Sequence, residues 1–216
     1  MSRQEPDTRQ TGASAERTLA VRKLGVMNRL GELGVDGVAS RLERLGGDRG
    51  VETEQVKCGY ADPVALAASF DADDRVGIRV RLSSAPHGYV LVLFPMESAN
   101  NAATMMLSDA VSDLSSVDND LAHSALVELG AMMAYGFMDA WADTFEQQID
   151  VGTPRRLHAP IRDAVAQTLG MDDDLGIYIG ARLHLPDRGI DADVLVFPET
   201  DTFVTLLELL RLEQVV

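Results

Sequence analysis

The sequence predicts an α+β fold in which two similar halves build one antiparallel sheet flanked by helices. Three observations carry this prediction: long stretches with helical periodicity, pairs of strands joined by tight turns, and the recurrence of both in the same order. With 216 residues, 46% of them hydrophobic, the chain can bury a substantial core. We interpret residues 1–15 as a disordered polar arm, and residues 16–216 as a single domain of two repeats, about 16–112 and 113–216.

The first half begins with one long helix. From Glu16, apolar residues recur mostly every three or four positions until Gly46 and Gly47 end the pattern. We then expect a strand at 51–58, a helical turn near 62–68, strands at 76–82 and 89–94, and a helix at 96–107. Pro86, His87 and Gly88 form the turn between the last two strands.

The second half repeats this order. Its predicted elements are a long helix at about 121–148, a helix near 160–169, strands at 176–185 and 190–197, and a helix at 202–212. The segment 30–34, with Glu32 at its centre, is echoed around Glu128, a displacement of 128 − 32 = 96. The segment 92–95 is echoed at 195–198, a displacement of 198 − 95 = 103. Two such halves pack most simply about a pseudo-twofold axis with their strands in one sheet, like a fused isologous dimer.

The charge of the chain limits its partners. Lys and Arg number 19 against 34 Asp and Glu, a net charge of −15, which repels phosphate backbones and anionic lipid headgroups. No apolar run approaches the roughly 20 residues of a transmembrane helix. We therefore expect a cytoplasmic protein that binds neither nucleic acid nor membranes. With 22 Asp, 17 Arg and only 2 Lys, the composition also indicates a salt-adapted surface.

Few residues suggest chemistry of their own. The single cysteine, Cys58, excludes an internal disulfide, and four scattered histidines form no zinc motif, so we expect no metal or cofactor belonging to this chain. The run Asp172–Asp174 lacks the spaced ligands of a calcium loop and is interpreted as solvated charge. Phe137 and Trp141 lie four apart and predict a shared core face, and the methionines of the helical stretches predict core packing.

The most specific motif lies in the second long helix. Ser124, Glu128 and the following Leu-Gly are spaced as in the pattern [Asp/Ser]-x-x-x-Glu-x-x-Asn, and Pro154 follows at a matching distance. The hairpin end at 91–98, which includes Phe94 and Pro95, adds a similar passage from strand to helix. In these features the chain resembles the CheC/CheX/FliM family of chemotaxis proteins, and within it the CheC type, from about residue 18 to the end.

The resemblance implies hydrolysis of the aspartyl phosphate of the response regulator CheY. In that family an Asn amide positions the attacking water and a Glu one turn earlier on the helix docks the regulator, which itself supplies the phosphorylated Asp, a Lys and Mg²⁺. We therefore assign Glu128 and Glu32 to the family's Glu positions. Ser124 and Asn28 complete the expected partner-binding set with these two glutamates.

Both water-positioning amides are missing. Ala131 stands three residues after Glu128, and the displacement of 96 puts Val35 at the corresponding position after Glu32. An alternative register, counted back from Leu42, instead puts Arg29 and Glu32 at the Glu and Asn positions. We favour the first register because it keeps the Leu-Gly-Glu-Leu-Gly segments together. Methyl and isopropyl groups cannot orient a water, and losing such a group costs on the order of 10²- to 10³-fold in rate.

Three functional hypotheses follow. The chain docks a response regulator such as CheY, or a CheD-type partner, with little or no phosphatase activity. Alternatively, it is an active CheY-phosphate phosphatase in which another side chain replaces the amide. A third hypothesis is a FliM-like component of a motility switch. The sequence favours the first, because Ala131 and Val35 argue against hydrolysis.

Overall fold

The protein is described by a computed structural model, which defines most of the chain. The description covers residues 21–44, 50–62, 65–66, 68, 75–108, 119–157, 160, 162–163, 165–166 and 176–210. The predicted arm at 1–15, the run Asp172–Asp174 and the predicted repeat boundaries lie outside these residues. The helical segments expected near 62–68 and 160–169 are described only in part, with helical residues at 65–66, 68, 162–163 and 165–166.

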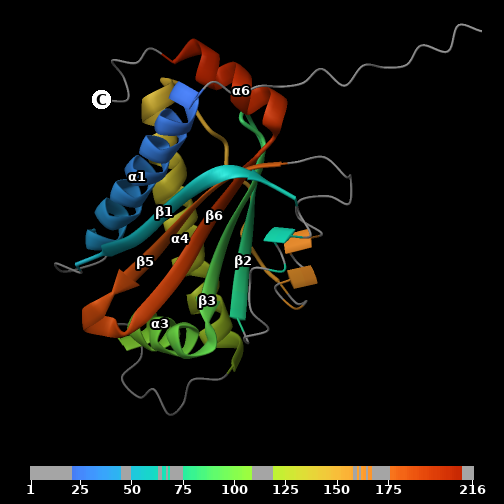
Figure 1. Ribbon diagram of the computed structural model, residues 1–216. Helices are drawn as coiled ribbons and strands as arrows, with labels where there is room; N and C mark the ends of the chain where they lie inside the picture. The colour runs from blue at the N-terminus through green and yellow to red at the C-terminus, as the bar shows by residue number, and fades with distance from the viewer. Residues whose placement is uncertain are drawn as a thin grey trace, which may run out of the picture.

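One antiparallel sheet organises the molecule (Figure 1). Its six strands have the order β1-β5-β6-β3-β2-β4. Their bounds are β1 Glu52–Ala61, β2 Arg75–Leu82, β3 Gly88–Pro95, β4 Arg155–Arg156, β5 Gly176–Leu185 and β6 Ile190–Pro198. The helices are α1 Val21–Glu43, α3 Met96–Ser108, α4 Asn119–Phe145 and α6 Thr200–Leu209, and the short 3-10 helix η2, Pro186–Arg188, joins β5 to β6.

Apart from the two partly described helical segments, the predicted helices and strands are confirmed to within a few residues where the structure describes them, and so is the α+β class. The second long helix ends at Phe145, three residues before the predicted end. Among the described elements, the two-residue strand β4 and the short 3-10 helix η2 were not predicted from the sequence. Leu82 and Val151 form an isolated bridge beside β4.

The strand order reads the same from both ends once β1, β2 and β3 are exchanged for β4, β5 and β6. The central pair β3–β6 shows the same symmetry in its register. A displacement of 103 converts the pair Leu91↔Leu195 into Val92↔Val194, which is the next pair of the ladder. The predicted pseudo-twofold axis therefore passes between β3 and β6. Because β1 pairs with β5 and β4 with β2, each half contributes its first strand to the other half.

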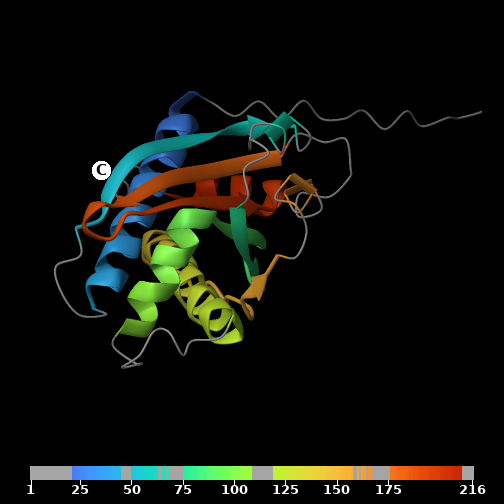
Figure 2. The same cartoon turned by 90° about the horizontal axis from the view of Figure 1, so that it is seen from below.

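The helices α1, α3 and α4 pack on one face of the sheet, as the view in Figure 2 shows, and Phe203 brings α6 into the same core. Side chains alternate along the strands, so that Ile78 and Val80 of β2 enter this main core with Phe94 of β3. Trp141 of α4 stacks on Phe203 of α6 with ring centroids 5.3 Å apart, and Phe137 lies 6.0 Å from Trp141. The predicted core face is thus confirmed.

The other face of the sheet carries a smaller apolar cluster. It consists of Leu91, Leu93, Val165, Leu195 and Phe197, with Leu66, Leu157, Ala166 and Tyr178 packed against it. Cys58 lies on the main-core side of β1, where its thiol donates to the carbonyl oxygen of Leu24. Burial raises the pKa of this thiol.

Among the described residues, α4 is the one helix long and apolar enough to cross a membrane by length and composition. Half of its most apolar window is buried, because α4 packs against α1, α3 and the sheet. Its apolar character therefore has an explanation within the core.

Candidate docking faces on two antiparallel helices

The two long helices cross where two glycines meet. A Cβ added to Gly37 would lie 2.2 Å from the carbonyl oxygen of Gly136, and one added to Gly136 would lie 2.7 Å from the carbonyl oxygen of Gly37. The backbones of α1 and α4 are therefore in direct contact at this point. Residues closer to the N-terminus of α1 contact residues closer to the C-terminus of α4. Gly34 lies against Phe137, and the Leu30 carbonyl accepts from the indole N–H of Trp141. The helices are antiparallel.

This crossing defines how the two repeats correspond. Under a twofold, a residue that contacts its own counterpart lies on the axis, so Gly37 and Gly136 are equivalent and the displacement is 136 − 37 = 99. The same displacement relates Gly31, whose added Cβ would meet Val56 and Ile179, to Gly130, whose added Cβ would meet Ile78 of β2.

Burial agrees with this displacement, since the pairs 30/129, 31/130, 34/133, 35/134, 38/137 and 42/141 are buried in both helices. The predicted displacement of 96 is therefore corrected for the helices. The packing of the two helices agrees with the alternative register. This register makes Arg29 the counterpart of Glu128, and Glu32 the counterpart of Ala131. Ser124 corresponds to Gly25, and Val35 to Ala134.

On α1, three predicted or alternative site residues come together. The Asn28 amide donates to Glu32 Oε1, and the Arg29 guanidinium donates to Glu32 Oε2, both over 3.0 Å. The side chains of Arg29 and Glu32 are 39% and 45% exposed, so this pair lies at the surface and is partly screened by solvent. Val35, by contrast, is only 3% exposed and belongs to the main core. Arg29 therefore already neutralises the charge that Glu32 would present to a partner.

On α4, Ser124 and Glu128 are both exposed, four residues apart on the same side of the helix. The Ser124 hydroxyl donates to the backbone carbonyl of Asp120. Within the described residues, no cation lies within ion-pair distance of Glu128. Ala131 is 2% exposed, so its methyl group offers no contact to a partner. This face presents a carboxylate without an adjacent amide.

The structure does not bring the two glutamates together. In the antiparallel pair, Glu32 lies between the positions that face Trp141 and Phe137, which places it opposite about residue 139 of α4. Glu128 is some 11 residues away along that helix, or roughly 16 Å at 1.5 Å per residue. The molecule therefore offers two separate helix faces rather than one combined site.

Next to Ser124 the structure shows a side-chain contact that the sequence did not predict. Arg156 of β4 lies 3.0 Å from Nδ1 of His123, the residue before Ser124. Nothing in the sequence signals this contact, because it depends on β4 crossing to the edge of the other half's hairpin.

Solved structures share this architecture. FliY from Thermotoga maritima has a TM-score of 0.69 and 12% identity, covering 89% of this chain and 97% of that one. The FliM middle domain from H. pylori has a TM-score of 0.58 and 8% identity, covering 88% and 99%. At these identities the likeness concerns the fold alone. By its fold, this chain therefore belongs to the same class of two-repeat proteins as FliY and the FliM middle domain.

The sequence places the chain within this class more narrowly. It is 32% identical to a Halobacterium salinarum protein named "Putative CheY-P phosphatase CheC1" over 190 residues, which are 87% of this chain and 95% of that relative. No family model matches the sequence. The chain belongs to the CheC/CheX/FliM family of chemotaxis proteins and is of the CheC type. The predicted resemblance is confirmed.

Proposed function

We propose that this chemotaxis protein docks a CheY-type response regulator through the exposed faces of α1 and α4 and hydrolyses its aspartyl phosphate slowly or not at all. The name of the CheC1 relative supports this class of partner. The regulator brings its own phosphorylated Asp, Lys and Mg²⁺, so this chain contributes the docking carboxylates Glu32 and Glu128 and the neighbouring Asn28 and Ser124. A CheD-type protein is the second partner proposed for this surface.

The observation that supports weak hydrolysis is the absence of an Asn from the family's Asn position on both helices. On α4 the position holds Ala131, which is buried and has no polar group. On α1 the packing puts Glu32 there, held by Arg29 and Asn28. A carboxylate at this position repels the anionic phosphoryl group and donates no hydrogen bond. A group that would orient the attacking water is therefore missing twice.

The two faces differ in their free charge. Glu32 is ion-paired, whereas Glu128 is exposed with no described cation near it. We therefore expect docking to depend more on Glu128. The test is binding of the phosphorylated regulator to the parent and to Glu128→Ala, with Asp143→Ala as the matched control. Asp143 is exposed on the same helix four turns later.

The Glu128→Ala variant should bind more weakly, while Asp143→Ala should bind as the parent does and both should keep their thermal stability within about 0.5 kcal/mol. Equal binding by all three proteins would remove the α4 face from the proposal.

Hydrolysis is tested by restoring the family's Glu-x-x-Asn pattern on α1, because an Asn introduced there would be exposed, whereas one at the buried position of Ala131 would not. Arg29→Glu with Glu32→Asn restores Glu-x-x-Asn on the exposed face of α1. Decay of the phosphorylated regulator with Mg²⁺ should be nearly unchanged by the parent and by Arg29→Glu alone, and faster with the double variant. Rapid decay with the parent would refute the proposal of slow or absent hydrolysis, because it would mean that another group orients the water.

A further inference from the structure

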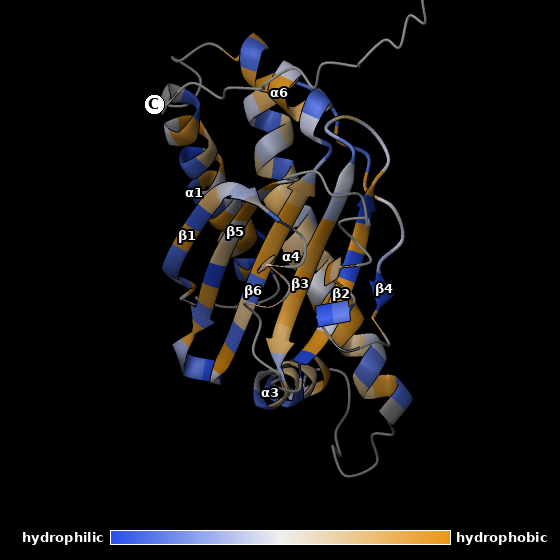
Figure 3. Cartoon of the chain, turned by 45° about the vertical axis from the view of Figure 1, so that its right-hand side comes forward, coloured by the Kyte–Doolittle hydropathy of each residue, from blue (hydrophilic) through white to orange (hydrophobic). Residues whose placement is uncertain are grey.

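Four arginines gather at the sheet edge formed by β2 and β4. Arg79 and Arg81 lie two apart on β2, and Arg155 and Arg156 are the two residues of β4. In the ladder Arg79 stands directly opposite Arg155, and Ile78 opposite Arg156. In Figure 3, β4 is blue, the polar colour, and β2 alternates between blue and orange because its arginines alternate with apolar residues. Such an arrangement concentrates positive charge in a protein whose net charge is −15.

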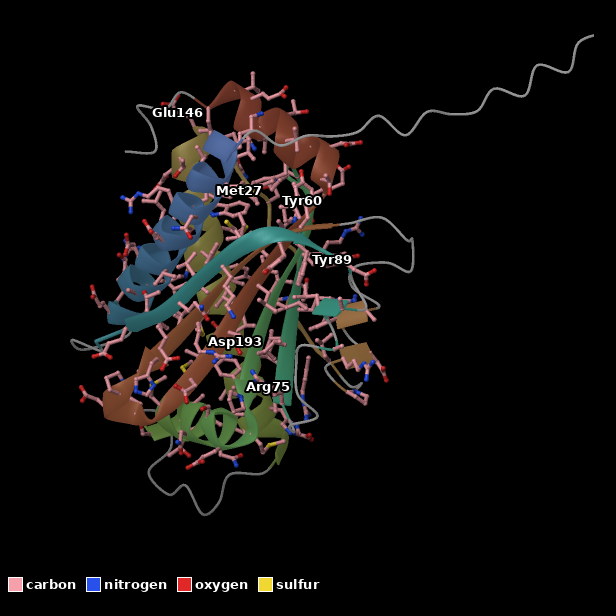
Figure 4. All side chains as sticks on the ribbon, in the orientation of Figure 1. Met27, Tyr60, Arg75, Tyr89, Glu146 and Asp193 are labelled. Atoms are coloured by element: carbon pink, nitrogen blue, oxygen red, sulfur yellow. The ribbon has the colours of Figure 1, made fainter. Side chains whose placement is uncertain are left out.

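Three of these side chains share one face. Ile78 enters the main core beneath the helices, so Arg79 and Arg81 point to the opposite face of the sheet, and Arg155 lies there with its partner Arg79. Arg81 and Arg155 are exposed, and Arg79 is half-buried. The Arg79 guanidinium lies 5.3 Å from the ring centroid of Tyr89, whose position on this face Figure 4 shows. The aromatic ring holds one guanidinium in place and leaves its hydrogen-bond donors available.

None of the four has a carboxylate partner among the residues that the structure describes. Arg156 donates to Nδ1 of His123, which carries no negative charge, and the Nε of Arg156 is buried without a partner. Among the described lysines and arginines, ion pairs form at five others, namely Lys23, Arg29, Arg41, Arg75 and Arg182. Arg75, on the same face of the same strand as Arg79, is bound to Asp193 at 2.6 Å. The excess of carboxylates in this protein thus leaves this edge uncompensated.

Like charges directly opposite one another destabilise a sheet, so the Arg79–Arg155 pair has a cost that a bound anion would remove. The spacing of the cluster indicates which anion fits. Arg79 and Arg81 are separated by two residues of a strand, or about 7 Å. An extended peptide with carboxylates at alternate positions repeats on one side at this same interval. A long nucleic acid strand would continue past the patch across a strongly acidic surface, which repels it.

We propose that this arginine edge, Arg79, Arg81 and Arg155, is a docking surface for an extended acidic segment of a partner protein with Asp or Glu at alternate positions. The guanidinium groups bind its carboxylates in forked pairs, and Tyr89 contacts the chain between them. This surface is distinct from the helix faces of the proposed regulator site, because it lies on the opposite face of the sheet.

The test uses a fluorescent octapeptide of alternating Glu and Ser, with an all-Ser octapeptide and an eight-residue oligothymidine as comparisons. Binding to the full chain is followed by fluorescence polarisation at the lowest salt concentration at which Trp141 fluorescence reports the folded state. The parent should bind the Glu-Ser peptide saturably and the all-Ser peptide not at all. The double variant Arg81→Glu/Arg155→Glu should lose roughly tenfold or more in affinity, through lost pairs and new repulsion.

A matched control separates local contact from net charge. Arg44→Glu/Arg188→Glu changes the total charge by the same amount at two exposed positions elsewhere, and it should bind within about twofold of the parent. An equal loss in both double variants would overturn the proposal, as would an absence of saturable binding by the parent. Tighter binding of the oligothymidine than of the Glu-Ser peptide would overturn the assignment to an acidic polypeptide.

Discussion

The contact between Gly37 and Gly136 should decide how closely the two long helices pack. Replacing Gly136 with Ala puts a methyl group 2.7 Å from the Gly37 carbonyl oxygen and 3.0 Å from Val38 Cα, all backbone atoms that cannot rotate away. Replacing Gly37 with Ala is more severe, at 2.2 Å from the Gly136 carbonyl oxygen. To reach an ordinary contact of 3.4 Å the helices must separate by 3.4 − 2.7 = 0.7 Å in the first case and 3.4 − 2.2 = 1.2 Å in the second.

The magnitude follows from two opposing effects. Overpacking at a rigid contact costs about 1–3 kcal/mol, and Ala gains about 1 kcal/mol over Gly in a helix interior. We expect Gly136→Ala to lose about 1 kcal/mol of stability and Gly37→Ala about 2 kcal/mol. Gly25→Ala, on α1 with nothing within 4 Å of its added Cβ, should gain up to about 1 kcal/mol instead.

The assay is urea unfolding followed by the fluorescence of Trp141, which is fully buried next to α1 and α6. Thermal midpoints should move in the same direction, by about 2–4 °C for each kcal/mol in a chain of this size. The reasoning is refuted if Gly136→Ala is as stable as Gly25→Ala, because the backbones of α1 and α4 would then not touch at this point.

Two further predictions concern charged groups. Asp193 lies between Arg75 and Arg182, and 12% of its side chain is exposed. Asp193→Ala leaves the Arg75 charge buried without its partner and should lower the free energy of unfolding in urea by about 3–5 kcal/mol. The control Asp139→Ala breaks a surface pair at a 66% exposed carboxylate and should cost under about 1 kcal/mol. Hydrogen bonding from Thr202 lowers the pKa of Glu199, which caps α6, so its contribution to stability is complete above the ordinary Glu pKa and is lost as pH falls through the lower folded value. The difference in thermal midpoint between the parent and Glu199→Gln should therefore shrink between pH 6 and pH 2, and a constant difference would contradict this linkage.

The helices and strands were predictable because their signals are local. Alternation along β2 and β3 and the turn at Pro86–Gly88 define a hairpin without reference to the rest of the chain. The order of elements then revealed the repeat, and with it the symmetric sheet. Strand β4 escaped prediction because two residues carry no periodicity, and its place depends on pairing with Ile78 and Arg79 of the other half.

The candidate site was predicted less completely. The sequence identified Glu32 and Glu128 as surface residues of the two long helices, and their exposure agrees. Their roles in docking stay a prediction. The sequence did not predict the arginine edge, because Arg79 and Arg155 are 76 residues apart along the chain and meet only through the β2–β4 ladder.

The sequence by itself determined the fold class, the element order and the membership of the family, since all three depend on local pattern and on similarity along the chain. It could not determine how α1 corresponds to α4. Leu-Gly occurs at 30–31 and again at 33–34, so two alignments three residues apart both keep a Leu-Gly step and nearly the same helix face. Only tertiary packing distinguishes them, because Gly37 alone lets the α4 backbone approach at Gly136, and that contact makes Arg29 rather than Glu32 the counterpart of Glu128.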